Sequence, residues 1–306
     1  SSVIFAFLKM ISNGIVTKFL FHYTNIIILK LNKYMNNDLI TLANRSLVKV
    51  SGNDYENFLQ SIITIDLSGK DRELLSSCFL SPQGKLLNQF FVIKEDNHFL
   101  LDLHKKSFQS FIDKMQIYKL NSDVNFEEKN DLEVVICLDK KFENSLPDPR
   151  HKDLGWRGIR KKGSSKSNPL NYEKKKISLG IVEEGEDFIS GEFFPIELNF
   201  DYLNSISFKK GCFIGQEVTS RMHRKGKPKK RVFSITSDRE NKPGEDISFE
   251  NKKIGTIIKS FENNSVAILK TDALPKIKKE KTTVYINDEE TSITVHMPNI
   301  LKDNIV

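Results

Sequence analysis

The sequence is poor in cysteine, and its three cysteines (Cys78, Cys137 and Cys212) lie far apart, with no C-x-x-C pair. A zinc site needs closely spaced ligands, and an odd, sparse set does not build a disulfide framework, so both are disfavoured. This cysteine usage fits a reducing compartment. The chain also lacks an uninterrupted apolar run near the ~18 residues that a bilayer-spanning helix requires, so we expect no membrane among its partners.

Acidic residues are missing from the start of the chain, where the first is Asp38. An acid-poor leader is typical of a mitochondrial transit peptide, but this one contains no arginine and few serines. We therefore expect residues 1–40 to be a poorly structured or non-native extension with the natural start at Met35, in a bacterial cytoplasmic protein. A transit peptide, and with it the mitochondrial matrix, is the alternative.

Positive charge is concentrated in two windows of this 306-residue chain, whose formal net charge is +7. Residues 150–176 and 209–231 each carry a net charge of +8, so the rest of the chain is net −9. Focused positive charge attracts and holds anions. For either window alone, a solvated basic loop is the alternative.

Apolar residues recur at strand and helix spacing from about residue 41 onward. A strand is expected at 47–50, followed by a helix through Ile62 in which Asn53 and Glu56 have capping-box spacing. The pattern also predicts a hairpin of 86–93 with 98–104, a helix at 108–118, a strand at 132–138 and a basic loop at 147–169. This alternation is typical of an α+β fold.

After residue 227 the pattern changes to short strands separated by turn residues, at 231–236, 254–258, 266–269, 282–286 and 292–296. Such spacing is typical of a small β-barrel or sandwich. The chain is long enough for several modest cores. We therefore predict an α+β region at 41–226 and a C-terminal β-barrel at 227–306.

The most informative segment is F-K-K-G-C-F-I-G-Q-E at 208–217. Two glycines bracket Cys212, two lysines precede it, and a helix is expected to open at Gln216. Nearby lysines and a helix N-terminus stabilise a thiolate and raise its reactivity. Cys212 is therefore the candidate functional thiol, with Lys210 as its catalytic companion. A packed cysteine in a turn is the alternative.

The stretch K-G-C-F-I-G-Q-E at 210–217 resembles the K-G-C-[aromatic]-x-G-Q-E signature of the YgfZ family and its mitochondrial iron–sulfur assembly relatives. Further family-like segments follow in the expected order between about residues 41 and 270. They are N-R-S-L at 44–47, S-G at 51–52, F-L-Q at 58–60, T-I-D-L at 64–67, S-P-Q-G-K at 81–85, D-P-R at 148–150, L-G-W-R at 154–157 and F-P-I-E-L-N at 194–199.

The resemblance implies the fold of the glycine-cleavage aminomethyltransferase, with α+β lobes around a central cleft and a C-terminal β-barrel. It also implies tetrahydrofolate or a one-carbon derivative in that cleft, and it implies that the segment 210–217 lies beside the turn at 84–89. Basic residues suit the anionic glutamate tail, and phenylalanines suit the pterin ring. The candidate folate-binding residues are Asn88, Gln89, Arg157, Glu197, Gln216 and Arg221.

The chain departs from the aminomethyltransferases at one position that matters. There, a carboxylate after the glycine turn acts on the folate, whereas Asn88 and Gln89 occupy the corresponding stretch here. An amide hydrogen-bonds a pterin but is not a base at neutral pH. We therefore expect a folate cleft without conventional enzymatic activity, an aminomethyltransferase-like transferase being the enzymatic alternative.

Three functions follow. The first is a folate-binding accessory protein for the assembly, maintenance or repair of iron–sulfur proteins, with Cys212 as its thiol and assembly or client proteins as partners. Because a cluster usually needs four protein ligands, a single cysteine would share a transient cluster with a partner. The second is an RNA-binding protein related to tRNA modification, without an aromatic RNP motif. The third is a true folate-dependent aminomethyltransferase, disfavoured by Asn88 and Gln89.

Overall fold

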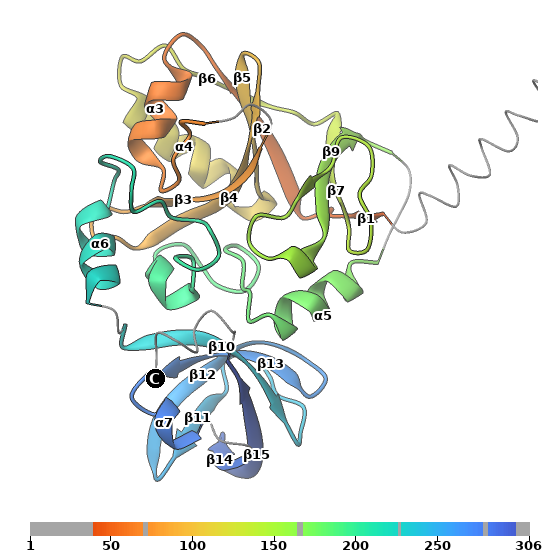
Figure 1. Ribbon diagram of the computed structural model, residues 1–306, viewed down its shortest axis with the longest axis vertical. Coiled ribbons are helices and arrows are strands. Elements are labelled where there is room, and N and C mark those ends of the chain that lie inside the picture. The colour runs from red at the N-terminus through yellow and green to blue at the C-terminus, as the bar shows by residue number, and fades with distance from the viewer. Residues whose placement is uncertain (1–38, 70–72, 164–167, 226–227, 278–280, 298–306) are drawn as a thin grey trace, which may run out of the picture. The chain divides into compact units, whose positions relative to one another are not determined.

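The computed structural model describes residues 39–69, 73–163, 168–225, 228–277 and 281–297. The prediction of an N-terminal extension therefore falls almost wholly outside the described residues. From residue 41 onward the chain forms a single contact unit, which contains two sheets and a closed barrel (Figure 1).

The first sheet is antiparallel, with the strand order β3-β4-β5-β2-β6. Its strands are β2 (Arg45–Ser51), β3 (Leu74–Leu80), β4 (Leu86–Glu95), β5 (His98–His104) and β6 (Asn125–Glu128). Helices α3 (Tyr55–Ile62) and α4 (Phe108–Lys119) pack Phe58, Leu59, Phe111 and Met115 into one core with the sheet (Figure 1). The predicted hairpin and both predicted helices are confirmed.

The capping box predicted at the start of α3 is wrong. The residue before the helix is Asp54, whose side chain makes no capping bond. The Asn53 amide instead donates to a carboxylate oxygen of Asp123 at 2.8 Å, and the Asp54 carboxylate accepts the Asp123 N–H at 2.8 Å. A contact between residues that are distant in sequence has therefore replaced the local capping bond.

The second sheet has the order β1-β7-β9-β8, with β1 (Ile40–Thr41), β7 (Leu132–Cys137), β8 (Leu146–Pro147) and β9 (Trp156–Lys161). The prediction of a basic loop at 147–169 is wrong for residues 156–161, which form β9. Each of these residues pairs antiparallel with a residue of β7. The short 3-10 helix η2 (Lys152–Leu154) precedes β9, and α5 (Leu170–Ser178) follows it.

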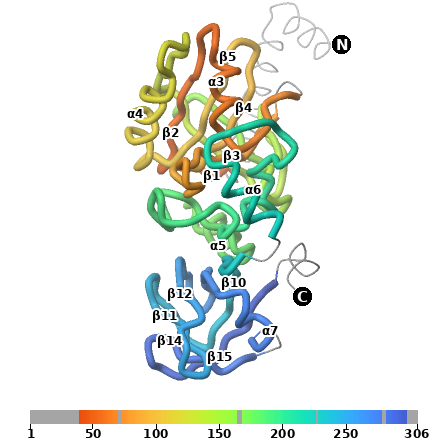
Figure 2. Tube along the Cα trace, turned by 90° about the vertical axis from the view of Figure 1, so that its left-hand side faces the viewer, coloured from red at the N-terminus to blue at the C-terminus, as the bar shows by residue number. Residues whose placement is uncertain are grey.

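The C-terminal part is a closed barrel in the order β10-β13-β12-β11-β14-β15, which confirms the predicted architecture. Its elements are β10 (Lys230–Ser237), β11 (Asp246–Phe249), β12 (Lys252–Phe261), β13 (Asn264–Lys270), α7 (Leu274–Ile277), β14 (Thr282–Ile286) and β15 (Glu289–His296). The 3-10 helix η3 (Pro195–Leu198) and α6 (Gln216–Arg224) precede the barrel in the chain, and β10 is the next element after α6 (Figure 2). Arg231 on β10 pairs with Asp201 at 2.7 Å, which ties the barrel to the segment after η3. No helix in the described ranges is long and apolar enough to cross a bilayer.

Candidate functional site

Cys212 is an exposed, free thiol, whereas Cys78 and Cys137 are free and buried. It lies in the loop that leads into α6. Next to it, Phe213 is buried and Ile214 packs against the core beneath α3 and α4. The loop therefore inserts apolar side chains into the fold and leaves the thiol in solvent. A packed cysteine is the wrong description of Cys212, although it fits the other two.

Lys210 is buried two residues before the thiol. Its ammonium donates to the backbone carbonyls of Gln60 at 2.7 Å, Ile63 at 2.8 Å and Ile65 at 2.8 Å. An ammonium has three N–H donors, so all three are used. Burial lowers the pKa of Lys210 to about 8, and the nearby Asp66 carboxylate acts in the opposite direction.

The other end of the loop lies against the β3–β4 turn. Gly215 has φ +79°, and a methyl group on it would lie 2.6 Å from the Ser81 carbonyl oxygen and 3.1 Å from the Cα of Gly84. The cysteine motif and the Gly84 turn are therefore neighbours, as the sequence predicts. Within the motif, the Gln216 amide donates to the Gly211 carbonyl at 3.2 Å.

Asn88 and Gln89 lie in the interior of β4. Adjacent strand residues point to opposite faces, so the two side chains do not converge on one ligand face. Both amide atoms of Asn88 are buried without a hydrogen-bond partner in the described structure, as is Nε2 of Gln89. The Gln89 oxygen accepts the N–H of Glu184 at 3.3 Å.

The remaining predicted ligand residues lie on three other elements. Arg157 on β9 is buried and pairs with Asp102 on β5, with Nε and Nη2 at 2.7 and 2.5 Å from the same oxygen. Burial has the largest single effect and lowers the pKa of Arg157, but Asp102 together with Tyr172 and Asp148 outweighs it, so the pKa is raised. The Glu197 carboxylate caps η3 by accepting the Phe194 N–H at 2.9 Å. Arg221 is exposed on α6.

A buried ionic network contains Arg150, Arg157 and Lys176 of the first basic window. Arg150 pairs with Asp148 at 2.8 Å and with Glu183 at 2.5 Å, and Lys176 pairs with Glu183 at 2.9 Å. Burial raises the pKa of Glu183, but Lys176 and Arg150 outweigh it and hold that pKa well below its usual range. Lys259 of the barrel extends the network by pairing with Asp187 at 2.8 Å. Two of these pairs are local in sequence: Asp148 with Arg150, and Glu173 with Lys176, which lie 2.9 Å apart on α5.

The second basic window contains the buried Lys210 and Arg231 together with several exposed cations. Lys209, Arg221, Arg224 and Lys225 are exposed, and none of them has an ion-pair partner among the residues that the structure describes. We call these four residues the α6 basic surface. These residues flank the cysteine loop in sequence and place four exposed positive charges near it.

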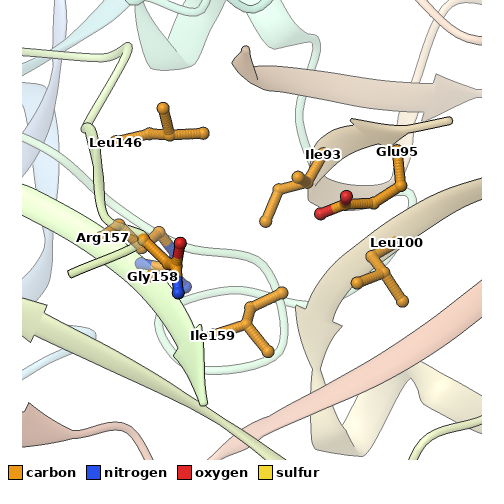
Figure 3. A pocket seen from close by; sticks show the side chains of 8 residues that line it. Ile93, Glu95, Leu100, Leu146, Arg157, Gly158 and Ile159 are labelled. Atoms are coloured by element: carbon orange, nitrogen blue, oxygen red, sulfur yellow. The ribbon is translucent and has the colours of Figure 1, made fainter. Parts of the chain in front are cut away.

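A pocket of about 210 Å³ lies between the β4–β5 hairpin and the strands β8 and β9. Figure 3 shows Ile93, Leu100 and Ile159 around it, with Arg157 on one side and Glu95 on the other. Its apolar walls with one cation and one carboxylate suit a flat heteroaromatic ring. The volume is below the ~300 Å³ at which whole drug-sized ligands are held, so the pocket has room for a single ring system. Within the described ranges, no group of three or more His, Cys, Asp or Glu side chains is placed to hold a metal ion.

The fold is that of an aminomethyltransferase. The glycine cleavage system aminomethyltransferase T from Bartonella henselae superposes with a TM-score of 0.68 at 12% identity, covering 85% of this chain and 84% of that one. At this identity the likeness shows the fold alone.

Sequence similarity points to a narrower group. The chain is 28% identical over 228 residues to "Iron-sulfur cluster assembly factor IBA57 homolog, mitochondrial" of Mycosarcoma maydis, covering 65% of this chain and 57% of that protein. It is 27% identical over 231 residues to "Iron-sulfur cluster assembly factor IBA57, mitochondrial" of Homo sapiens, covering 63% and 65%. The chain thus spans between half and two thirds of the length of these relatives. No protein-family model matches it.

Proposed function

We propose that this protein acts in iron–sulfur cluster assembly by presenting Cys212 to a partner protein. The observation that carries the proposal is a free, exposed thiol in a loop whose two ends are fixed to the body of the protein. One thiolate supplies one of the four ligands that a cluster usually needs, so the partner supplies the others. The cluster is cargo shared between the two proteins. The names of the relatives support this role and favour the mitochondrial matrix over the cytoplasm.

The α6 basic surface is the region where we propose that the partner docks. Its exposed cations favour an acidic protein surface and would raise the association rate at low salt. The same charges suit tRNA phosphates, which is the alternative. Titration of the protein with tRNA over a range of salt concentrations distinguishes the two. Tight tRNA binding that is lost in Arg221→Glu would favour the RNA function.

A reduced folate is the proposed small ligand, as tetrahydrofolate or a one-carbon derivative. Its pterin ring matches the apolar walls of the pocket beside Arg157, and the Glu95 carboxylate would accept from ring N–H groups. When bound, a one-carbon derivative of folate would bring a one-carbon group to this site. Leu146→Phe fills the pocket from β8 and should abolish folate binding in a fluorescence titration, with tRNA absent or present. Undiminished binding would show that folate binds at another site, for example at Asn88 and Gln89.

The main test compares Cys212→Ser with the native protein in cells that lack it. We expect Cys212→Ser to fail to restore the activity of iron–sulfur enzymes in these cells, because serine is a poor nucleophile and a poor iron ligand at neutral pH. Cys137→Ala is the control, since that thiol is buried and outside the loop. Full rescue by a folded Cys212→Ser protein would remove the thiol from the function.

A further inference from the structure

The three carbonyls around Lys210 come from one short segment at the end of α3. The Gln60 carbonyl belongs to the last turn of the helix, and those of Ile63 and Ile65 follow it. Carbonyls at a helix C-terminus carry partial negative charge and favour a cation. The segment therefore forms a cage for an ammonium group. We call it the α3 carbonyl cage (the carbonyls of Gln60, Ile63 and Ile65).

Side chains from the same segment hold the cage in shape. The Gln60 amide donates to Asp66 Oδ1 at 2.8 Å and accepts the Leu67 N–H at 2.8 Å. Asp66 also accepts the Ser68 hydroxyl at 2.6 Å, and the Ser68 bonds, with a smaller contribution from Gln60, lower the pKa of Asp66. The cage is thus closed by its own hydrogen bonds, independently of Lys210.

We infer that Lys210 is a positioning residue, which fixes the conformation of the cysteine loop by inserting its ammonium into the α3 carbonyl cage. Because all three N–H groups are bound to carbonyls, the ammonium has no donor left for a hydrogen bond to the Cys212 thiolate. Lys210 thereby joins the K-G-C motif at 210–212 to the segment 60–66, which lies about 145–150 residues earlier in the sequence. The link to cluster chemistry rests on the proposed function, whereas the anchoring of the loop does not.

The test places a nitroxide spin label on Cys212, the exposed cysteine of the described chain. In Lys210→Met we expect the label to become several-fold more mobile in its electron paramagnetic resonance spectrum, while circular dichroism stays native. Lys209→Met is the matched control, because it removes the same charge from the adjacent, exposed position without touching the cage. Its spectrum should equal that of the native protein.

Chemical rescue makes the role of the ammonium specific. In Lys210→Ala, added propylammonium should enter the cage and restore the immobile spectrum, whereas tetramethylammonium, which has no N–H donor, should not. If the Lys210 variants do not fold, Asp66→Asn loosens the cage from a half-buried position and should give intermediate mobility.

Two results would overturn the inference. One is a native spectrum for every folded variant of Lys210 and for Asp66→Asn. The other is equal rescue by both ammonium ions. Failure of the proposed function is seen separately, as full complementation by Cys212→Ser, and leaves the spectra of the labelled protein unaffected.

Discussion

The buried pair of Arg157 and Asp102 gives the sharpest test of whether the first basic window is structural. Both side chains are 2% exposed, and the second oxygen of Asp102 is held by Arg45 at 2.6 Å. Removing one member of a buried pair costs about 3–5 kcal/mol, because the remaining charge is left uncompensated. Arg45 still neutralises Asp102 in Arg157→Met, so we expect the lower end, about 3 kcal/mol.

Urea unfolding followed by circular dichroism measures this loss directly. In a thermal scan, ~3 kcal/mol corresponds to roughly 6–12 °C for a domain of this size. Arg160→Met is the control, since Arg160 lies on the same strand but is 28% exposed and pairs with Glu133. Its partner Glu133 is 9% exposed but still accepts the Gly163 N–H in the variant, so we expect a loss of about 1–2 kcal/mol, less than at Arg157.

The opposite outcome has a clear meaning. If the free energy of unfolding of Arg157→Met differs from that of the native protein by less than about 0.5 kcal/mol, as is usual for surface substitutions, then the reasoning about the buried pair is wrong. Loss of folate binding at unchanged stability would then assign Arg157 to the ligand, as the sequence predicts. Charge reversal is unsuitable at Arg157 because it would place two carboxylates together in the interior.

Other outcomes follow from the same contacts. Cys212→Ser should change the free energy of unfolding by less than about 0.5 kcal/mol, since the thiol is exposed, and a larger loss in urea unfolding would show that it packs. Gly215→Ala should cost about 1–3 kcal/mol, because its methyl group would collide with the Ser81 carbonyl at a positive φ; native stability would contradict the close approach. For Glu183, whose pKa is depressed, the ionised form stabilises the fold above its ordinary pKa of 4.5, and this contribution is lost as the pH falls through the folded-state pKa. Glu183→Gln should therefore be less stable at pH 7 and lose less stability on acidification than the native protein, and parallel pH curves would refute this. Arg221→Glu should weaken polyglutamylated folate more than the monoglutamate in a binding titration, and equal losses would exclude a tail contact.

Local patterns predicted the elements that depend on local periodicity. The hairpin of β4 and β5, helix α4 and five of the six barrel strands show their apolar spacing in the sequence, whereas β11 was not predicted. Strand β9 was missed because its residues are basic, and its strand conformation depends on pairing with β7 across about 20 intervening residues. The cap at Asn53 failed for a similar reason, since Asp123 supplied a better partner from a distant loop.

Some features of the candidate site were likewise predictable from the sequence, and others were not. The motif around Cys212 and its contact with the Gly84 turn were predictable, because both belong to a recognisable order of segments. The use of the Lys210 ammonium was not, since its three acceptors are backbone carbonyls and carry no side-chain signal. Asn88 and Gln89 were grouped as one ligand pair, whereas strand geometry turns them to opposite faces. Their role as folate ligands stays a prediction.

The two basic windows show why net charge alone does not locate a binding surface. Both carry +8, yet the first places Arg150, Arg157 and Lys176 in the interior, where carboxylates from other segments neutralise them. Charges compensated in the interior contribute little field outside, whereas exposed cations within a Debye length of an approaching anion steer it. Long-range attraction of an anionic partner should therefore come from the α6 basic surface, next to the free thiol. The salt dependence of association should consequently fall when Arg221 and Arg224 are replaced by neutral residues, and it should persist when the exposed Lys105 and Lys106 are replaced in the same way.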